Sequence, residues 1–435
     1  MNQLAETQSL QYHPLQAMLY QEMHSRPYQV VPCPALITHY VLLTDDHQKS
    51  LQFSHLQKLF EAFEQEVPEC DQPNLQFEAQ GFRVRREVHL EFSAFTFINF
   101  NVDPKNPFDK GGLAELPDNW LNELPGTVLS NFHVALQCID DKDQQLISNA
   151  KSLLEGYRLV GSSPQNGDAR LWTSFKQHSD GYGRFLIGNV LMSDSQIGRL
   201  TQRIIEIETY RMLTLLALPL ARENTAKLNA MDAQLVALTN QLACKGVFSE
   251  QEILLELTEM ASQVEALRSR CAFRYSATFA YYDLVLKRLS ELKEDEVSGH
   301  LSLSEFITRR LTPAVNTCRA ANERLESLSL RIDRVSDMMR TKVELSIQAQ
   351  NQQLLTSMDN RSRIQLMMQH TVEGLSVAAI SYYSIGLLKY MIESFDVSGL
   401  PVTKYQLVGI SVPLVVASVW LVTRKVHKRF KKMAD

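Results

Sequence analysis

The sequence has 435 residues, of which 45% are hydrophobic and 21% are charged, and its formal net charge is -5 at neutral pH. This length is more than one usual hydrophobic core accommodates, so two or three structural parts are expected. The slightly acidic balance argues against a nucleic-acid-binding protein, and no nucleic-acid partner is expected.

Residues 1–195 contain most of the strand-like sequence and predict a cytoplasmic α+β domain. Two groups loosely repeat the order strand, helix, strands, which is typical of an antiparallel or mixed sheet with helices packed on it. The expected elements are a strand at 35–43, a helix at 47–65, strand sequence within 82–100, a strand at 127–139, a helix at 143–159 and strands at 169–176 and 183–192.

Between residues 82 and 92, ionic residues alternate with apolar ones, as in a strand with one buried and one polar face. On one continuous strand, Glu87, His89 and Glu91 would share a face, which is the geometry that a metal site uses. A face that is simply solvated or salt-bridged explains the same alternation.

A second ionic group lies near the N-terminus, where Glu22, His24 and Arg26 alternate with other residues. Both groups contain the residue types of an acid/base or metal site. The sequence has no GxGxxG, P-loop, HExxH or GxSxG motif. No catalytic, cofactor-binding or metal-ligating residue is therefore assigned, the cofactor stays unknown, and an enzyme is not the expected function.

From residue 196 the sequence becomes helical, and a helical bundle is expected over 196–312, followed by a long stalk helix over 313–372. The S-x-x-E spacing that begins at Ser249 and again at Ser302 is that of a capping box, so each serine is expected to open a helix, the first about 40 residues long. No glycine or proline interrupts residues 314–373, where apolar residues keep a spacing of three and four. This seam fits packing within the chain and self-association equally well.

Two apolar runs follow, and both approach the roughly 20 residues that a membrane-spanning helix needs. We expect a first transmembrane helix at 373–394, an outer turn at 395–404 and a second transmembrane helix at 405–423. The alternative is that one or both runs are buried helices of a soluble domain.

Basic residues flank both runs, with Arg361 and Arg363 before the first and a basic tail at 424–435 after the second. By the positive-inside rule both chain ends are then cytoplasmic. Anionic lipid is a further expected contact of the tail, and a stop-transfer flank is the simpler explanation of its charge. The basic residues of the tail are Arg424, Lys425, Lys428, Arg429, Lys431 and Lys432.

Polar residues in and before the first run are candidates for lining a pore. Helix packing and ordinary solvent exposure are the alternatives, since small and hydroxylated residues are common at helix contacts in membranes. The candidates are Asn351, Met358, Asp359, Ser376, Ser381, Tyr383 and Ser384.

Several stretches together resemble an uncharacterised family of bacterial membrane-anchored proteins, catalogued as a domain of unknown function. They include EMHSRP from Glu22, LPGTVL from Leu124, DGYGRFL from Asp180 and FRYSATFAYYDLV from Phe273. The sequence departs from that family's pattern around Arg86, where an aromatic residue and a second arginine are expected nearby. The resemblance covers nearly the whole chain and implies membrane anchoring, but it implies no activity.

The order of the parts also resembles the CorA-type magnesium channels, in which a long stalk helix becomes the first span and a second span and a basic tail follow. The likeness is one of architecture. The Gly-Met-Asn motif of those channels is absent, and residues 393–396 read Glu-Ser-Phe-Asp in its place.

The predicted function is an inner-membrane scaffold or sensor that presents an α+β domain on a helical stalk. A CorA-like ion channel or transporter is the alternative. The expected partners are the lipid bilayer and further copies of the chain, with a divalent cation as an additional candidate.

Overall fold

The computed structural model describes residues 13–16, 19–20, 30–79, 81–108, 113–139, 143–243, 250–394 and 404–434. For residues 143–147, 243, 404 and 427–434 it describes the backbone only. The chain divides into two compact units. The first contains Met1–Phe248 and Leu255–Val335, and the second contains Ser249–Leu254 and Ser336–Asp435.

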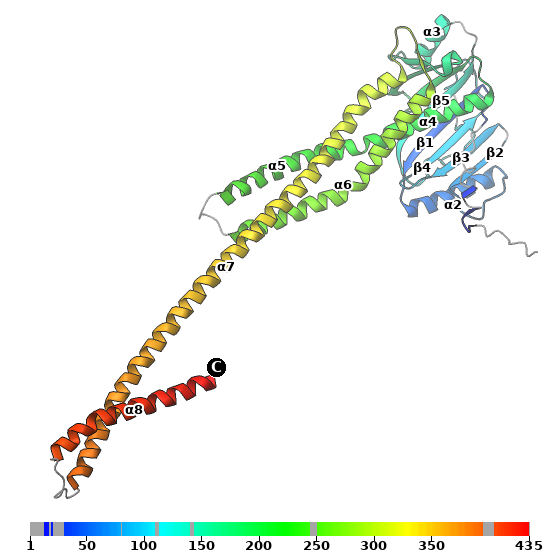
Figure 1. Cartoon of the computed structure of the whole chain (residues 1–435). Helices are drawn as coiled ribbons and strands as arrows, with labels where there is room; N and C mark the ends of the chain where they lie inside the picture. Colours follow the sequence, from blue (N-terminus) through cyan, green and yellow to red (C-terminus); the bar gives the residue numbers. More distant parts are fainter. Residues whose placement is uncertain are drawn as a thin grey trace, which may run out of the picture. The chain divides into compact units, whose positions relative to one another are not determined.

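The centre of the first unit is a mixed sheet of nine strands in the order β2-β3-β4-β1-β5-β8-β7-β6-β9, as Figure 1 shows in part. Its strands are antiparallel neighbours, except that β5 and β8 run parallel. The strands are β1 (Ala35–Leu43), β2 (Asn74–Ala79), β3 (Phe82–Val88), β4 (Phe92–Asn99), β5 (Thr127–Cys138), β6 (Val160–Ser163), β7 (Ala169–Gln177), β8 (Gly183–Asn189) and β9 (Asp295–Glu296).

The loose repeat expected from the sequence is visible in this order. From the centre of the sheet outward, the strands of one half follow in the order β1-β4-β3-β2, and those of the other half in the order β5-β8-β7-β6. In each half, the first strand in the sequence is central and the other three follow in reverse sequence order. The two halves differ in direction, because β4 is antiparallel to β1 whereas β8 is parallel to β5. The prediction of an antiparallel or mixed sheet is therefore confirmed as a mixed one.

Helices pack on both faces of the sheet. On one face, α2 (Asp46–Ala62) contributes Leu56 and Leu59 to an aromatic core, and α3 (Asp143–Leu153) packs beside Trp172. The other face is covered by α4 (Asp194–Leu215), whose Ile197, Leu200, Ile204 and Ile207 are buried against the strands. Their spacing of three and four residues is that of an amphipathic helix, which is why this helix lies flat on a sheet.

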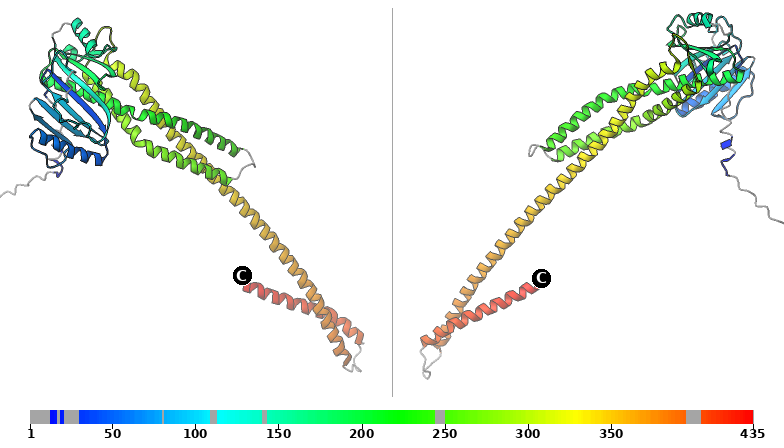
Figure 2. Two further views of the ribbon diagram at one scale, coloured as in Figure 1. Left: turned by 180° about the vertical axis from the view of Figure 1, so that it is seen from behind. Right: turned by 45° about the horizontal axis from the view of Figure 1, so that its top comes forward.

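Long helices follow, namely α5 (Ala217–Ala243), α6 (Glu250–Leu292) and α7 (Leu303–Ser394). In the first unit, α5, most of α6 and the first part of α7 lie side by side in both views of Figure 2. Ala217, Ala221 and Ala321 are buried where they meet, and these small side chains let the backbones approach closely. The helices predicted to open at Ser249 and Ser302 begin one residue later, and α6 has 43 residues.

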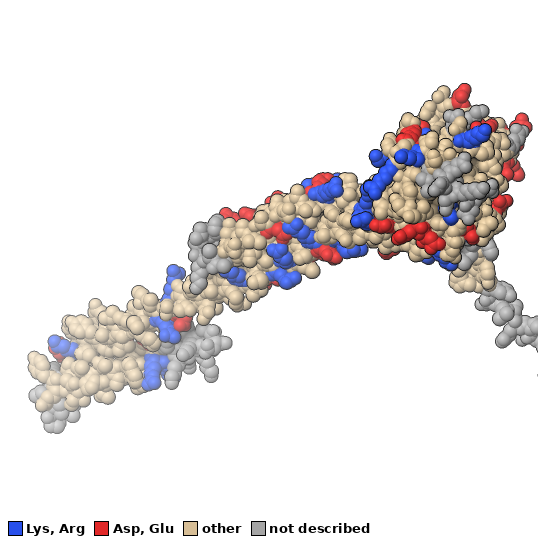
Figure 3. Space-filling model, turned by 90° about the horizontal axis from the view of Figure 1, so that it is seen from above, with Lys and Arg blue, Asp and Glu red and all other residues tan. Residues whose placement is uncertain are grey.

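In the second unit, α7 continues without a break to Ser394, so the predicted stalk and the first apolar run are parts of one helix of 92 residues. The final helix is α8 (Lys404–Ala434), which continues through the basic residues that were expected to form a separate tail. Of the described residues, these two helices are long and apolar enough to cross a membrane. Figure 3 shows few charged side chains at this end of the molecule, in contrast to the bundle. Most of the predicted outer turn lies outside the described residues.

Candidate functional site

The site begins with two rows of side chains on the α4 face of the sheet. Residues that pair across neighbouring strands point to the same face. The register places His39 of β1 beside Thr96 of β4, and Thr96 beside Arg85 of β3. Ala94 lies beside Glu87 in the next row. A polar strip therefore crosses three strands of an otherwise apolar sheet.

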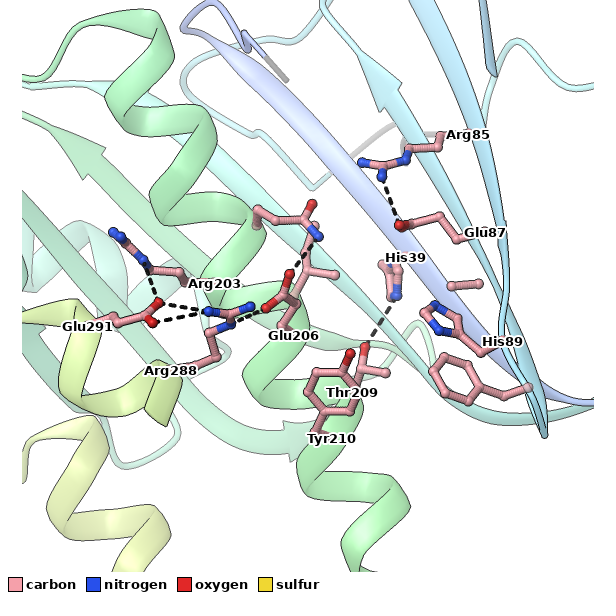
Figure 4. A pocket seen from close by; sticks show the side chains of 14 residues that line it. His39, Arg85, Glu87, His89, Arg203, Glu206, Thr209, Tyr210, Arg288 and Glu291 are labelled. Carbon is pink, nitrogen blue, oxygen red and sulfur yellow. Dashed lines mark hydrogen bonds and ion pairs between the residues drawn. The ribbon is translucent and has the colours of Figure 1, made fainter. Parts of the chain in front are cut away.

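Helices α4 and α6 complete a pocket of about 230 Å³ over this strip (Figure 4). Helix α4 contributes residues from successive turns of one face, and α6 contributes two residues of its last turns. The lining residues are His39, Arg85, Glu87, His89, Phe92, Ala94, Gln202, Arg203, Ile205, Glu206, Thr209, Tyr210, Arg288 and Glu291.

One wall of the pocket is an ionic cluster that joins α4 to α6. Arg288 of α6 donates to Glu206 of α4 and pairs with Glu291 at 2.9 Å. Arg203 of α4 lies 3.4 Å from Glu291, and Gln202 donates to Glu206 at 3.1 Å. Partial burial of these groups reduces screening by water, so the cluster holds the two helices together more strongly than exposed pairs would.

The opposite wall belongs to the sheet. Arg85 donates to Glu87 at 2.7 Å, and the two side chains are only 8% and 14% exposed. Next to them, His39 is 1% exposed and its ring nitrogens contact Thr96 at 2.9 Å and Thr209 at 3.3 Å. Burial, followed by the nearby charge of Arg85, lowers the pKa of His39 to about 3, so this ring is neutral at physiological pH.

Two of the three residues predicted on the ionic strand, Glu87 and His89, line this pocket. The three residues do not share one strand, because β3 ends at Val88 and β4 begins at Phe92. A tight hairpin connection, closed by the bond from the backbone N–H of His89 to the carbonyl of Phe92 at 2.8 Å, separates the three side chains. The alternation of ionic and apolar residues continues through this connection, so it could not reveal the hairpin.

The third residue predicted on the ionic strand, Glu91, contacts α6 and does not line the pocket. It accepts hydrogen bonds from Arg274 and, at 2.7 Å, from the hydroxyl of Tyr281. Burial and the bond to this carboxylate raise the pKa of Tyr281, which therefore stays protonated as a donor. Glu91 thus ties the β3–β4 hairpin to α6.

The comparison with family models gives a match over residues 11–430 to a family described as "Protein of unknown function (DUF3422)". The chain belongs to the DUF3422 family. No curated protein and no solved structure matches it. Membership of DUF3422 therefore agrees with the resemblance noted in the sequence, and it supplies no activity.

The second predicted ionic group of this DUF3422 chain, Glu22, His24 and Arg26, lies outside the described residues. Within the described part of the chain, no three His, Cys, Asp or Glu side chains are grouped so that they could hold a metal ion. The divalent cation stays a prediction.

The predicted pore residues are spread along α7 in the second unit of the DUF3422 chain. Asn351 and Met358 are exposed, and Asp359 pairs with Arg363 at 3.1 Å. Ser376 donates to the carbonyl one turn earlier, while Tyr383 is 71% exposed. Ser381 differs, because it is buried and Ser384, three residues on, is half-buried.

Two residues of the basic tail have described side chains. Arg424 and Lys425 are exposed, and the guanidinium of Arg424 lies 5.0 Å from the ring centre of Trp420. For Lys428, Arg429, Lys431 and Lys432 only the backbone of α8 is described. Trp420 and Arg424 lie one turn apart within α8.

A further polar cluster, with two buried members and the exposed Glu155, lies on the α3 face of the sheet. The hydroxyl of Ser174 is 3.0 Å from His178 Nε2, and Nδ1 of that ring is 3.4 Å from Glu155. This is the order of contacts in a hydrolytic triad. Ser174 and His178 are only 6% and 5% exposed, however, and Glu155 also accepts from Ser179. The cluster therefore serves to fix the connection after α3.

The sequence did not single out most of the pocket. His39 lies in a strand whose other residues are apolar or Thr and Tyr, and Arg203, Arg288 and Glu291 lie on helices with many ionic residues. One signal was present: a histidine in the middle of a fully buried strand must have a hydrogen-bond partner, which predicts a polar neighbour on the same face.

Proposed function

We propose that the protein is a membrane-anchored scaffold or sensor, in which the end of α7 and α8 span the bacterial inner membrane and the sheet domain lies in the cytoplasm. One observation carries this proposal. The most apolar windows of these helices are 6% and 0% buried, respectively. The core helix of a soluble protein would be mostly buried, so the low buried fraction of these two windows argues against buried helices of a soluble domain.

The dimensions support two spans. The apolar stretch Tyr405–Val426 has 22 residues, and at 1.5 Å per residue it is about 33 Å long, close to the thickness of the hydrocarbon core. In α7, Lys389 and Glu393 lie in the last turns, where long side chains reach the interface. Tyr390, near the end of α7, is 72% exposed, and tyrosine is favoured at membrane interfaces.

The orientation follows from charge. Arg361 and Arg363 precede the apolar part of α7, and six basic residues follow that of α8. The positive-inside rule favours both flanks in the cytoplasm, which leaves only the short connection outside.

Association of several copies fits the stretch of α7 before the membrane. Leu345, Leu354, Met358 and Met367 are each at least 60% exposed. Self-association would remove such apolar surface from water. Light scattering of the detergent-solubilised protein measures the number of copies, and a monomer would contradict this part of the proposal.

A CorA-like channel is the second candidate, and Ser381 is the observation that favours it. This side chain is 4% exposed, and within the described structure its hydroxyl has no hydrogen-bond partner. A polar group buried in an apolar helix of a membrane protein is often part of a polar path or a helix contact. Ion flux in liposomes that falls in Ser381→Val with unchanged assembly would support the channel, and absence of flux in the unaltered protein would exclude it.

The anchor is tested by extraction of cell membranes with alkaline carbonate, which releases peripheral proteins. We expect the protein to stay in the membrane pellet. In Val416→Arg, a charge at the middle of α8 disfavours insertion by about 2.5–3.5 kcal/mol, and more of the protein should become extractable. Val343→Arg, a helix position before the apolar run, is the control and should not change extraction. Quantitative release of the unaltered protein would overturn the proposal.

A further inference from the structure

We propose that the pocket between α4 and the sheet binds a small zwitterion of the amino-acid class. Its carboxylate would be held by Arg85 and its ammonium by the glutamate carboxylates that line the same pocket. Membrane insertion plays no part in this inference, so the inference and the anchor proposed above can fail independently.

The carboxylate position follows from Arg85. This residue is 7% exposed, lines the pocket, and in the described part of the chain makes one hydrogen bond, from Nη2 to Glu87. A guanidinium has several N–H donors in a planar fork, so the donors of Arg85 that do not contact Glu87 can bind a ligand in the pocket. A carboxylate provides two acceptor oxygens in the geometry that a guanidinium matches.

The need for a positive group follows from the charge balance of the lining. Three arginines, Arg85, Arg203 and Arg288, face three glutamates, Glu87, Glu206 and Glu291. These six side chains sum to no net charge, and the buried His39 is neutral. A dianion or a polyamine gains little attraction from such a lining, whereas a molecule with one charge of each sign can pair at both ends.

Within the cluster, Arg288 differs from Arg85. It already donates to both Glu206 and Glu291, so its donors are largely used inside the protein. Of these two arginines, Arg85 is therefore the one with capacity for a ligand. Glu206 is 21% exposed, and Glu87 is 14% exposed, so both carboxylates can be approached from the pocket.

The size of the ligand is limited. A volume of about 230 Å³ is below the roughly 300–1,000 Å³ of drug-sized sites. Phe92 and Ala94 give the pocket a partly apolar wall, which suits a short hydrocarbon body between two charged ends. This volume favours a small ligand over a nucleotide.

The test is isothermal titration of the full-length protein in detergent with two series of matched probes. One series is γ-aminobutyrate, butyrate and butylamine, and the other is alanine, propionate and ethylamine. In at least one series, the zwitterion should bind at least about tenfold more tightly than either analogue with a single charge. Equal affinity of a single-charge analogue, or no heat from any probe at about 10 mM, would overturn the proposal.

Variants locate the site. Arg85→Gln should weaken binding of the zwitterion at least about tenfold. Arg83→Gln is the matched control, because Arg83 lies on the same strand and face as Arg85 but pairs with Glu78 outside the pocket. The affinity of this variant for the zwitterion should equal that of the unaltered protein.

Because Arg85 is buried, Arg85→Gln could lose binding by unfolding, so a second variant is needed that changes the pocket but keeps the fold. Ala94→Leu adds apolar volume to the pocket wall on a strand, and it should abolish binding while unfolding in urea remains cooperative. Unchanged binding in Ala94→Leu would show that the ligand lies elsewhere and would refute the assignment.

Discussion

The buried His39 should make the sheet domain sensitive to acid. The pKa of His39 is lowered from 6.5 to about 3 by burial and then by the charges of Arg85 and His89. Below pH 6.5 the unfolded chain takes up a proton on this ring that the folded protein does not take up. Stability is therefore fully present above about pH 6.5 and is lost as the pH falls toward 3.

The magnitude follows from the two pKa values. At about pH 5, protonation of the unfolded state alone lowers the free energy of unfolding by about 2 kcal/mol, and the limit below pH 3 is about 5 kcal/mol. The substitution His39→Gln keeps a polar group beside Thr96 and Thr209 and removes the titration. Its own cost in packing is the same at every pH, so the change between pH values isolates the proton.

The assay is urea unfolding followed by tryptophan fluorescence, since Trp120 and Trp172 are buried in the sheet domain. Between about pH 8 and pH 5, His39→Gln should lose about 2 kcal/mol less than the unaltered protein. His47→Gln, at an exposed position of α2, is the control and should behave like the unaltered protein. Equal losses in the protein and in His39→Gln would refute the reasoning.

Two further substitutions test packing. In Gly161→Ala the new Cβ would overlap the ring of Trp172, its partner in the β6–β7 ladder, so we expect a loss of about 1–3 kcal/mol in urea unfolding; no loss would contradict this contact. Asp232 of α5 bridges Arg324 at 2.7 Å and Arg331 at 2.6 Å on α7. Because these side chains are partly exposed, Asp232→Asn should lower stability by only about 1 kcal/mol, seen as faster amide hydrogen exchange in α5, and unchanged exchange would show that the bridge contributes nothing.

Much of the architecture was predictable because it depends on local periodicity. The spacing of apolar residues gave the strand and helix types, and the capping serine at Ser302 located the start of α7 to one residue. The absence of glycine and proline from residues 314–373 predicted that this part of α7 is continuous, and the helix also continues through Pro313 and Gly374. These signals are contained within a few turns of chain.

The pocket was not predictable in the same way, because it depends on register between distant strands. His39, Thr96 and Arg85 become neighbours only through the pairing of β1, β4 and β3. The hairpin connection at His89 preserves the alternation of residue types, so the sequence could not show that Glu91 leaves the pocket for α6. Arg288 lies 82 residues after its partner Glu206 in the sequence, a separation that periodicity does not span.

The central claim is that α7 and α8 cross the membrane with both ends in the cytoplasm. It is tested most directly by labelling of Ser394→Cys with a membrane-impermeant maleimide in right-side-out and inside-out vesicles. We predict labelling of the introduced thiol only in right-side-out vesicles, and labelling of the exposed native Cys70 only in inside-out vesicles. Labelling of both thiols from the same side would contradict the two-span arrangement.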